Sequence, residues 1–246
     1  VVTESHGSHS AAQQTNPMVH PTRTNAYWNA RTNTLDNEFA PYFFRHARRM
    51  HRALTMICDL DFPDRLCIPE GRPVVFAANH RSFLDVAVAS AVFSHFQLTC
   101  RFQVQARMFD APVIGRWLHN LGCIPTNTET KEQSEATSVA ALLAGHTVAV
   151  MPEGRLVPPA ERVGGVGAGR PGLSRIAQRA GALTIPVACS GSSRVWPRGR
   201  PLPKTGLFGH ETVRVQFGAP MDLTGEDHQE NVDAVMESIR VMLDGR

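Results

Sequence analysis

Short apolar runs alternate with longer amphipathic stretches from residue 73 onward. The short runs at 73–78, 101–106, 147–151 and 212–217 are apolar or alternate strictly, which predicts strands. The longer stretches at 83–93, 112–121, 131–144 and 231–243 have the length or spacing of helices, and Pro112 suits a first helical turn. Strands that alternate with helices predict an α/β fold, a single domain whose mostly parallel central sheet is flanked by helices.

The residues before this alternating region divide into two parts. Residues 1–34 are rich in Ser, Thr, Asn, Gln and His, which predicts a flexible polar arm. Residues 35–60 contain an N-terminal amphipathic helix. One face carries Phe43, Ala47, Met50 and Leu54, and the other faces carry Arg45, Arg48, Arg49 and Arg52. The pattern is equally typical of a helix that packs on the core and of one that contacts a membrane interface.

Composition indicates one ordinary globular core. The 246 residues are 42% hydrophobic and 19% charged, a size and composition that need no covalent staples. The five cysteines are odd in number and have no zinc-site spacing, so we expect reduced thiols and no structural metal. No run approaches the ~18 apolar residues of a membrane span and no signal-peptide layout opens the chain, so any membrane contact is expected to be peripheral.

Positive charge is concentrated in one part of the chain. Residues 155–204 hold eight arginines and one lysine against Glu161 alone, which predicts attraction for anions. The same stretch has a single aromatic residue, Trp196, and no nucleic-acid-binding module is visible, so nucleic acid is not expected as a partner. The phosphates of a lipid, of a thioester carrier's nucleotide or of a bilayer surface explain this charge.

The segment Asn79 to Asp85 follows the strand predicted at 73–78. His80 therefore lies at a strand-to-helix turn, the edge at which α/β sheets place their ligands. Asp85 falls in the first helical turn, where the helix dipole keeps it ionised and where it can hold one ring nitrogen of His80. The alternative is structural, because Ser82-x-x-Asp85 also fits a capping box.

A second polar segment follows the strand predicted at 147–151. It reads Pro152-Glu153-Gly154-Arg155, in which glycine permits close approach of a ligand and the guanidinium can hold a phosphate. Alone it is weak evidence, because many strand-ending turns carry Glu and Arg for solubility. The glycine-rich stretch 164–169 matches neither a P-loop nor a dinucleotide fingerprint, and predicts either a mobile flap or a plain surface loop.

Taken together, the two segments resemble the glycerophospholipid acyltransferase family typified by the lysophosphatidate acyltransferases. That family is marked by an Asn-His-x-x-x-x-Asp block and, downstream, a Phe-Pro-Glu-Gly-Thr-Arg block. Further likenesses extend the match over residues 70–220: Gly122-Cys123-Ile124-Pro125, Arg170-Pro171-Gly172 and Ile185-Pro186-Val187-Ala188. Two departures concern the acceptor. Thr128, preceded by Asn127, stands where relatives usually have an arginine, and Arg155 follows Gly154 without an intervening threonine.

The resemblance implies that residues 61–246 form an acyltransferase domain. It would move a fatty acyl chain from acyl-CoA or acyl carrier protein to lysophosphatidic acid, forming phosphatidic acid, with no bound cofactor. His80 would be the catalytic base and Asp85 its partner, and Glu153, Gly154 and Arg155 would bind the acceptor. The expected location is cytoplasmic, peripheral on the inner face of the cell membrane.

Several alternatives stay open at this stage. The acceptor could instead be glycerol 3-phosphate, another lysophospholipid or a glycolipid. The protein could also be a non-catalytic lipid-binding protein or a hydrolase. No Gly-x-Ser-x-Gly elbow is present, so direct attack of the acceptor on a thioester is the simplest mechanism.

Overall fold

The computed structural model describes residues 39–127, 129–200, 202–204 and 210–245, together with two short segments at 28–29 and 34–35. These two segments are the strands β1 (Trp28–Asn29) and β2 (Thr34–Leu35), which pair antiparallel. The rest of the predicted polar arm lies outside the described residues.

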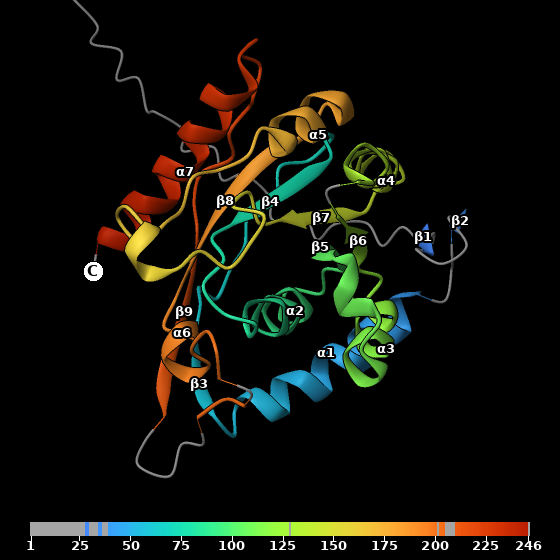
Figure 1. The fold of residues 1–246 in the computed structure, drawn as a ribbon. Helices are drawn as coiled ribbons and strands as arrows, with labels where there is room; N and C mark the ends of the chain where they lie inside the picture. Colours follow the sequence, from blue (N-terminus) through green and yellow to red (C-terminus); the bar gives the residue numbers. More distant parts are fainter. Residues whose placement is uncertain are drawn as a thin grey trace, which may run out of the picture.

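A seven-stranded sheet forms the centre of the protein, with the strand order β3-β9-β8-β4-β7-β5-β6 (Figure 1). The strands are β3 (Cys58–Asp61), β4 (Val74–Ala78), β5 (Cys100–Gln105), β6 (Ile124–Thr126), β7 (Thr147–Val150), β8 (Leu183–Ser190) and β9 (Glu211–Phe217). Neighbours are parallel except for β8 and β9, so β3 and β9 run opposite to the other five strands. The predicted α/β fold with a mostly parallel sheet is confirmed.

Helices cover both faces of this sheet. They are α1 (Phe39–Leu54), α2 (Asp85–His95), α3 (Pro112–Asn120), α4 (Lys131–Leu143), α5 (Gly172–Ala180), α6 (Ser192–Val195) and α7 (His228–Asp244), with single 3₁₀ turns η1 (Ala106–Phe109) and η2 (Pro159–Glu161). Figure 1 shows α1, α2 and α3 on one face and α4, α5 and α7 on the other. No helix of the described chain is both long and apolar enough to cross a bilayer.

Alternation along the central strands explains these layers. In β4, Val74 and Phe76 pack into the core under α1 and α2, whereas Val75 and Ala77 pack into the core under α4, α5 and α7. Because both faces are covered, the strand is a continuous apolar run instead of an alternating one. The same burial leaves only the ends of the strands open to ligands.

The apolar stripe of α1 packs on the core. Phe43, Ala47 and Leu54 are almost fully buried, and α1 lies against α2 and α3. The four arginines of the helix are exposed. Of the two interpretations of this amphipathic pattern, core packing therefore explains the apolar face, and β3 joins the same N-terminal region to the edge of the sheet.

Two helices begin at residues other than those that the sequence predicts. Helix α2 begins at Asp85 instead of residue 83, because residues 79–84 form the turn that leaves β4. Helix α7 begins at His228 instead of residue 231, because the Asp227 carboxylate accepts hydrogen bonds from the amides of Gln229 and Glu230. Both differences reflect local polar contacts at a helix start.

Candidate active site

The turn after β4 is fixed to the neighbouring strand β8 by Asn79. This fully buried side chain donates to the carbonyl oxygen of Cys189 over 2.9 Å and accepts from the amide of Cys189 over 2.7 Å. The amide side chain thus continues the pairing of β4 with β8 beyond the last strand residue. The chain then turns, and His80 projects beyond the carboxyl end of the strand.

His80 and Asp85 form a hydrogen-bonded pair. His80 Nδ1 lies 2.9 Å from Asp85 Oδ2, and the side chains are 19% and 3% exposed. The same Oδ2 accepts hydrogen bonds from the amides of Arg81 and Ser82, over 2.7 and 2.8 Å. Because Asp85 Oδ2 accepts hydrogen bonds from two backbone N–H groups, it also acts as an acceptor toward the histidine, and the Nδ1–H group of His80 donates to it. The lone pair of Nε2 is then available to a substrate.

The capping alternative describes part of the same geometry. Asp85 accepts from the Ser82 amide, and the Ser82 hydroxyl oxygen accepts from the Leu84 amide over 3.1 Å. Asp85 is also the first residue of α2, where the helix dipole favours a negative charge. One carboxylate therefore shapes the turn and orients the histidine.

Glu153, which follows β7, links the His80 turn to the glycine-rich loop. Its Oε2 accepts from the His80 amide over 2.8 Å and its Oε1 accepts from the Gly167 amide over 2.7 Å. The side chain is 3% exposed, and burial raises its pKa, while the two amides and the nearby His80 and Arg162 oppose that rise. These contacts make Glu153 a positioning residue for the backbone of His80, and its predicted contact with the acceptor stays a prediction.

The glycine-rich loop is fastened to the His80 turn. Val163 and Val166 exchange backbone hydrogen bonds across Gly164 and Gly165, both at positive φ. The Arg81 guanidinium donates to the Gly165 carbonyl oxygen through Nε and Nη2, over 3.1 and 2.7 Å. Of the two predicted descriptions, an anchored surface loop agrees with these contacts better than a mobile flap.

Gly154 and Arg155 lie beside further positive charge. Gly154 has φ +67°, and a Cβ built there would lie 3.1 Å from Nε of Arg170. Arg155 is about half exposed and forms an ion pair with Glu161. Arg170 thus lies directly over the glycine, whereas Arg155 is engaged away from it. In the sequence, Arg170 was noted only as part of the family-like segment Arg170-Pro171-Gly172, and nothing there indicated this contact.

The other departure from the family pattern is at Thr128. Thr128 lies outside the described residues. Asn127, before it, uses its side-chain oxygen to accept from the amide and hydroxyl of Thr130, over 2.5 and 2.6 Å, in the turn that leads to α4. Among the described residues, no group of three His, Cys, Asp or Glu side chains could hold a metal ion.

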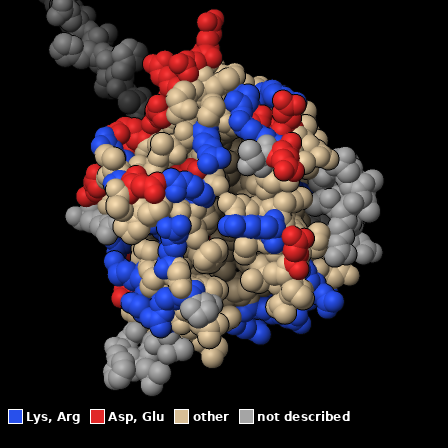
Figure 2. Space-filling view, in the orientation of Figure 1, with Lys and Arg blue, Asp and Glu red and all other residues tan. Residues whose placement is uncertain are grey.

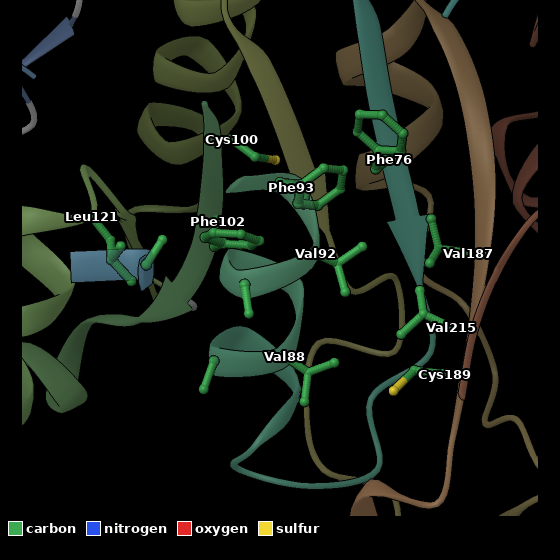
Figure 3. Packing of buried hydrophobic residues seen from close by; sticks show 14 of the residues in the cluster. Phe76, Val88, Val92, Phe93, Cys100, Phe102, Leu121, Val187, Cys189 and Val215 are labelled. Atoms are coloured by element: carbon green, nitrogen blue, oxygen red, sulfur yellow. The ribbon is translucent and has the colours of Figure 1, made fainter. Parts of the chain in front are cut away.

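A narrow apolar cavity of about 30 Å³ lies between α2 and the sheet. Its lining extends from Asn79 and Asp85 at one end to Phe93 and Phe217. Figure 3 shows Val88 and Val92 of α2 facing Val187, Cys189 and Val215 across this interior. The sequence patterns gave no sign of this cavity, because it is formed by elements far apart in the chain.

The surface around this region carries positive charge. Figure 2 shows a hollow among uncharged side chains with several Lys and Arg side chains around it. Arg155 and Arg170 are exposed on the turns that follow β7. An apolar interior, a histidine held by a carboxylate and surrounding cations can together bind an amphiphilic anion and remove a proton from it.

Comparison with known proteins gives three related findings. The family model described as Acyltransferase matches residues 62–190. The chain is 25% identical over 152 residues to the chloroplastic 1-acyl-sn-glycerol-3-phosphate acyltransferase LPAT1 of Arabidopsis thaliana, a match that covers 61% of this chain and 39% of that protein. The chain thus spans about two fifths of the length of this relative.

The fold also resembles a solved structure, the crystal structure of the 1-acyl-sn-glycerophosphate acyltransferase PlsC from Thermotoga maritima. The TM-score is 0.63 at 20% sequence identity, over 84% of this chain and 79% of that one. At this identity the likeness concerns the fold. Because the family model covers more than half of the sequence, with the His80 and Glu153 segments inside the matched range, this protein belongs to the acyltransferase family.

Proposed function

We propose that this protein transfers a fatty acyl chain from an acyl thioester to the free hydroxyl of lysophosphatidic acid, forming phosphatidic acid. The observation that carries the proposal is the His80–Asp85 pair at the end of β4, with an apolar cavity that reaches Asp85. Family membership supports the acyl transfer, and the acyltransferase activities of the two relatives on a 1-acyl-sn-glycerophosphate support the acceptor.

In the proposed reaction, His80 acts as the general base. Nε2 takes the proton of the acceptor hydroxyl as its oxygen attacks the thioester carbonyl carbon, and Asp85 stabilises the imidazolium that forms. The new C–O bond gives the ester, the C–S bond breaks, and the proton passes to the thiolate, so the products are an ester and a free thiol. A positioned base of this kind contributes ~10² to 10⁴ in rate.

The two substrates have separate places in this proposal. The acyl chain would lie in the cavity between α2 and the sheet, whose side chains must move apart to admit it. The acceptor phosphate would lie over Gly154, beside Arg170. Arg155 could join it by exchanging Glu161 for the phosphate, since an exposed ion pair contributes only ~0 to 1 kcal/mol.

Acyl-CoA or acyl carrier protein is the proposed donor. We further propose that the protein works in the cytoplasm, peripherally on the inner face of the cell membrane. The exposed arginines of α1 support this location, because the cytoplasmic leaflet is anionic.

A panel of acceptors tests the proposed reaction. Lysophosphatidic acid, glycerol 3-phosphate, another lysophospholipid and a glycolipid are each supplied with palmitoyl or oleoyl thioesters, and both the released thiol and the acylated product are measured. We expect the highest kcat/KM with lysophosphatidic acid. Thiol release without an acceptor would instead indicate a hydrolase, and lipid binding without thiol release would indicate a non-catalytic protein.

A further inference from the structure

A second cavity, separate from the candidate active site, lies between α1 and the carboxyl end of α2. Its volume is about 340 Å³, at the lower end of the range for small-molecule sites. Its polar lining consists of Arg48, His51, Arg52, Ser94, His95 and Gln97, and we call it the α1–α2 groove. Asp85 begins α2 and His95 ends it, so the groove lies ~15 Å along the helix from the His80–Asp85 pair.

The positive charge of the groove is not paired with any acidic side chain of the described residues. The guanidinium groups of Arg48 and Arg52 form no ion pair or hydrogen bond with any described residue, and no acidic side chain lines the groove. Helix α1 itself contains four arginines, two histidines and no acid. Burial, with the charges of Arg49 and Arg45, lowers the pKa of His46 on the same helix. In Figure 2, Lys and Arg side chains gather along the lower edge, where Figure 1 places α1.

These arginines could instead serve to neutralise the carboxyl end of α2, but two of its last carbonyl groups already have partners. Ser94 O accepts from the amide and the side chain of Gln97, both over 3.2 Å, and Phe93 O accepts from the Leu98 amide over 2.9 Å. Ser94, a residue that is 7% exposed, lines the groove, and its hydroxyl has no hydrogen-bond partner among the described residues. Two open guanidinium groups and an open hydroxyl are therefore available to one ligand.

We propose that the α1–α2 groove is a phosphate-binding site, in which Arg48 and Arg52 hold the phosphate group and Ser94 adds a hydroxyl donor. Guanidinium groups bind phosphate through paired charge-assisted hydrogen bonds. Phe44 and Ala91 form an apolar side of the groove, which suits the glycerol and first methylenes of a phospholipid. The phosphate belongs either to an anionic lipid headgroup or to a soluble ion, and it occupies a site that the proposed acyl transfer does not use.

The α1 sequence provides a matched control. The double variant Arg48→Gln/Arg52→Gln removes two charges that line the groove, and Arg45→Gln/Arg49→Gln removes two charges from the same helix outside it. All four side chains are exposed, so both variants should fold. The whole chain is tested in two arms. One measures partition onto phosphatidylcholine vesicles with and without phosphatidylglycerol, and the other measures the melting temperature in inorganic phosphate against chloride at equal ionic strength.

We expect the control variant to lose no more than about 25-fold in vesicle partition, because each of its two basic residues near an anionic surface contributes about fivefold. The groove variant should lose at least about tenfold more, because it also loses the charge-assisted contacts with the phosphate. Binding of inorganic phosphate to the folded state should raise the melting temperature of the wild type and of the control more than that of the groove variant, which keeps only the proposed acceptor-phosphate site beside Arg170. A response in the vesicle arm alone identifies a lipid headgroup, and a response to inorganic phosphate shows that the ion suffices. The proposal would be overturned if both variants lost vesicle partition equally and inorganic phosphate did not raise the melting temperature. It would also be overturned if the wild type bound neither vesicles nor phosphate.

Discussion

Replacing Asp85 should separate catalysis from stability. The Asp85 Oδ2 accepts from His80 Nδ1 and from the amides of Arg81 and Ser82. Asp85→Ala removes all three acceptor contacts, and each buried amide that loses its acceptor costs ~1 to 3 kcal/mol. With Ser82 buried and Arg81 partly exposed, we expect a loss of about 2 to 4 kcal/mol. At ~2 to 4 °C per kcal/mol for a chain of this size, the melting temperature should fall by about 4 to 16 °C.

Asp85→Asn isolates the charge. Its side-chain oxygen can still accept from the two amides, so we expect a stability loss of no more than about 2 kcal/mol. Without a carboxylate, the imidazolium of His80 is not stabilised and kcat should fall by ~10² to 10⁴. His80→Ala should lower kcat to a similar extent with little change in melting, because the side chain makes a single hydrogen bond among the described residues.

The control for this series is Asp227, which also accepts from two backbone amides at a helix start but lies at the beginning of α7. Asp227→Ala should cost ~0.5 to 2 kcal/mol and leave kcat per folded molecule unchanged. Each variant is assayed by thiol release from the thioester beside a thermal melt. Two results would refute the proposed base. One is wild-type turnover in a folded His80→Ala protein. The other is a loss of activity in Asp85→Asn that is no larger than the fraction of that variant that is unfolded.

Three further predictions concern other parts of the protein. Arg155→Ala and Arg170→Ala should each lower kcat/KM for lysophosphatidic acid about 10-fold to 150-fold and leave a neutral monoacylglycerol unaffected, which steady-state kinetics with both acceptors checks. Val92→Phe, in the wall of the apolar cavity, should shift the preferred thioester to shorter chains, and an unchanged chain-length profile would place the acyl chain elsewhere. Burial, together with the charge of Arg101, lowers the pKa of His146 from 6.5 to about 3, so the folded state disfavours its protonation. Above pH 6.5, His146 is neutral in both the folded and the unfolded state. Below pH 6.5 only the unfolded chain binds the proton, so the free energy of unfolding falls by ~1.4 kcal/mol per pH unit. Urea unfolding from pH 7 to 5 should therefore show a steeper stability loss in the wild type than in His146→Gln.

Sequence patterns predicted the elements whose signals are local. The apolar runs that became β4 and β7 and the helical stretches that became α3 and α4 agree with the structure within one or two residues. Strand β8 was not predicted, because Pro186 interrupts its run and proline seldom lies within a sheet. Amphipathicity left open whether the apolar face of α1 contacts the core or a membrane interface, and only the tertiary structure shows that this face packs on α2.

The candidate site was predictable only in part for the same reason. The five-residue spacing of His80 and Asp85 anticipates a contact within one turn, and the structure brings them together. The contacts of Glu153 with the amides of His80 and Gly167 depend on elements up to 73 residues apart. The reciprocal bonds between Asn79 and Cys189 span 110 residues. No local pattern specifies partners at such distances.

The bond from the Cys189 amide to the Asn79 side chain has a consequence for hydrogen exchange. This amide, near the end of β8, donates to a side chain of the turn that holds His80 and not to a strand carbonyl. Its exchange rate therefore measures how often the turn that holds His80 releases the sheet, whereas neighbouring β8 amides measure the opening of the sheet itself. A single amide in the interior of the protein thus reports the local order of the candidate catalytic residues without any substrate present.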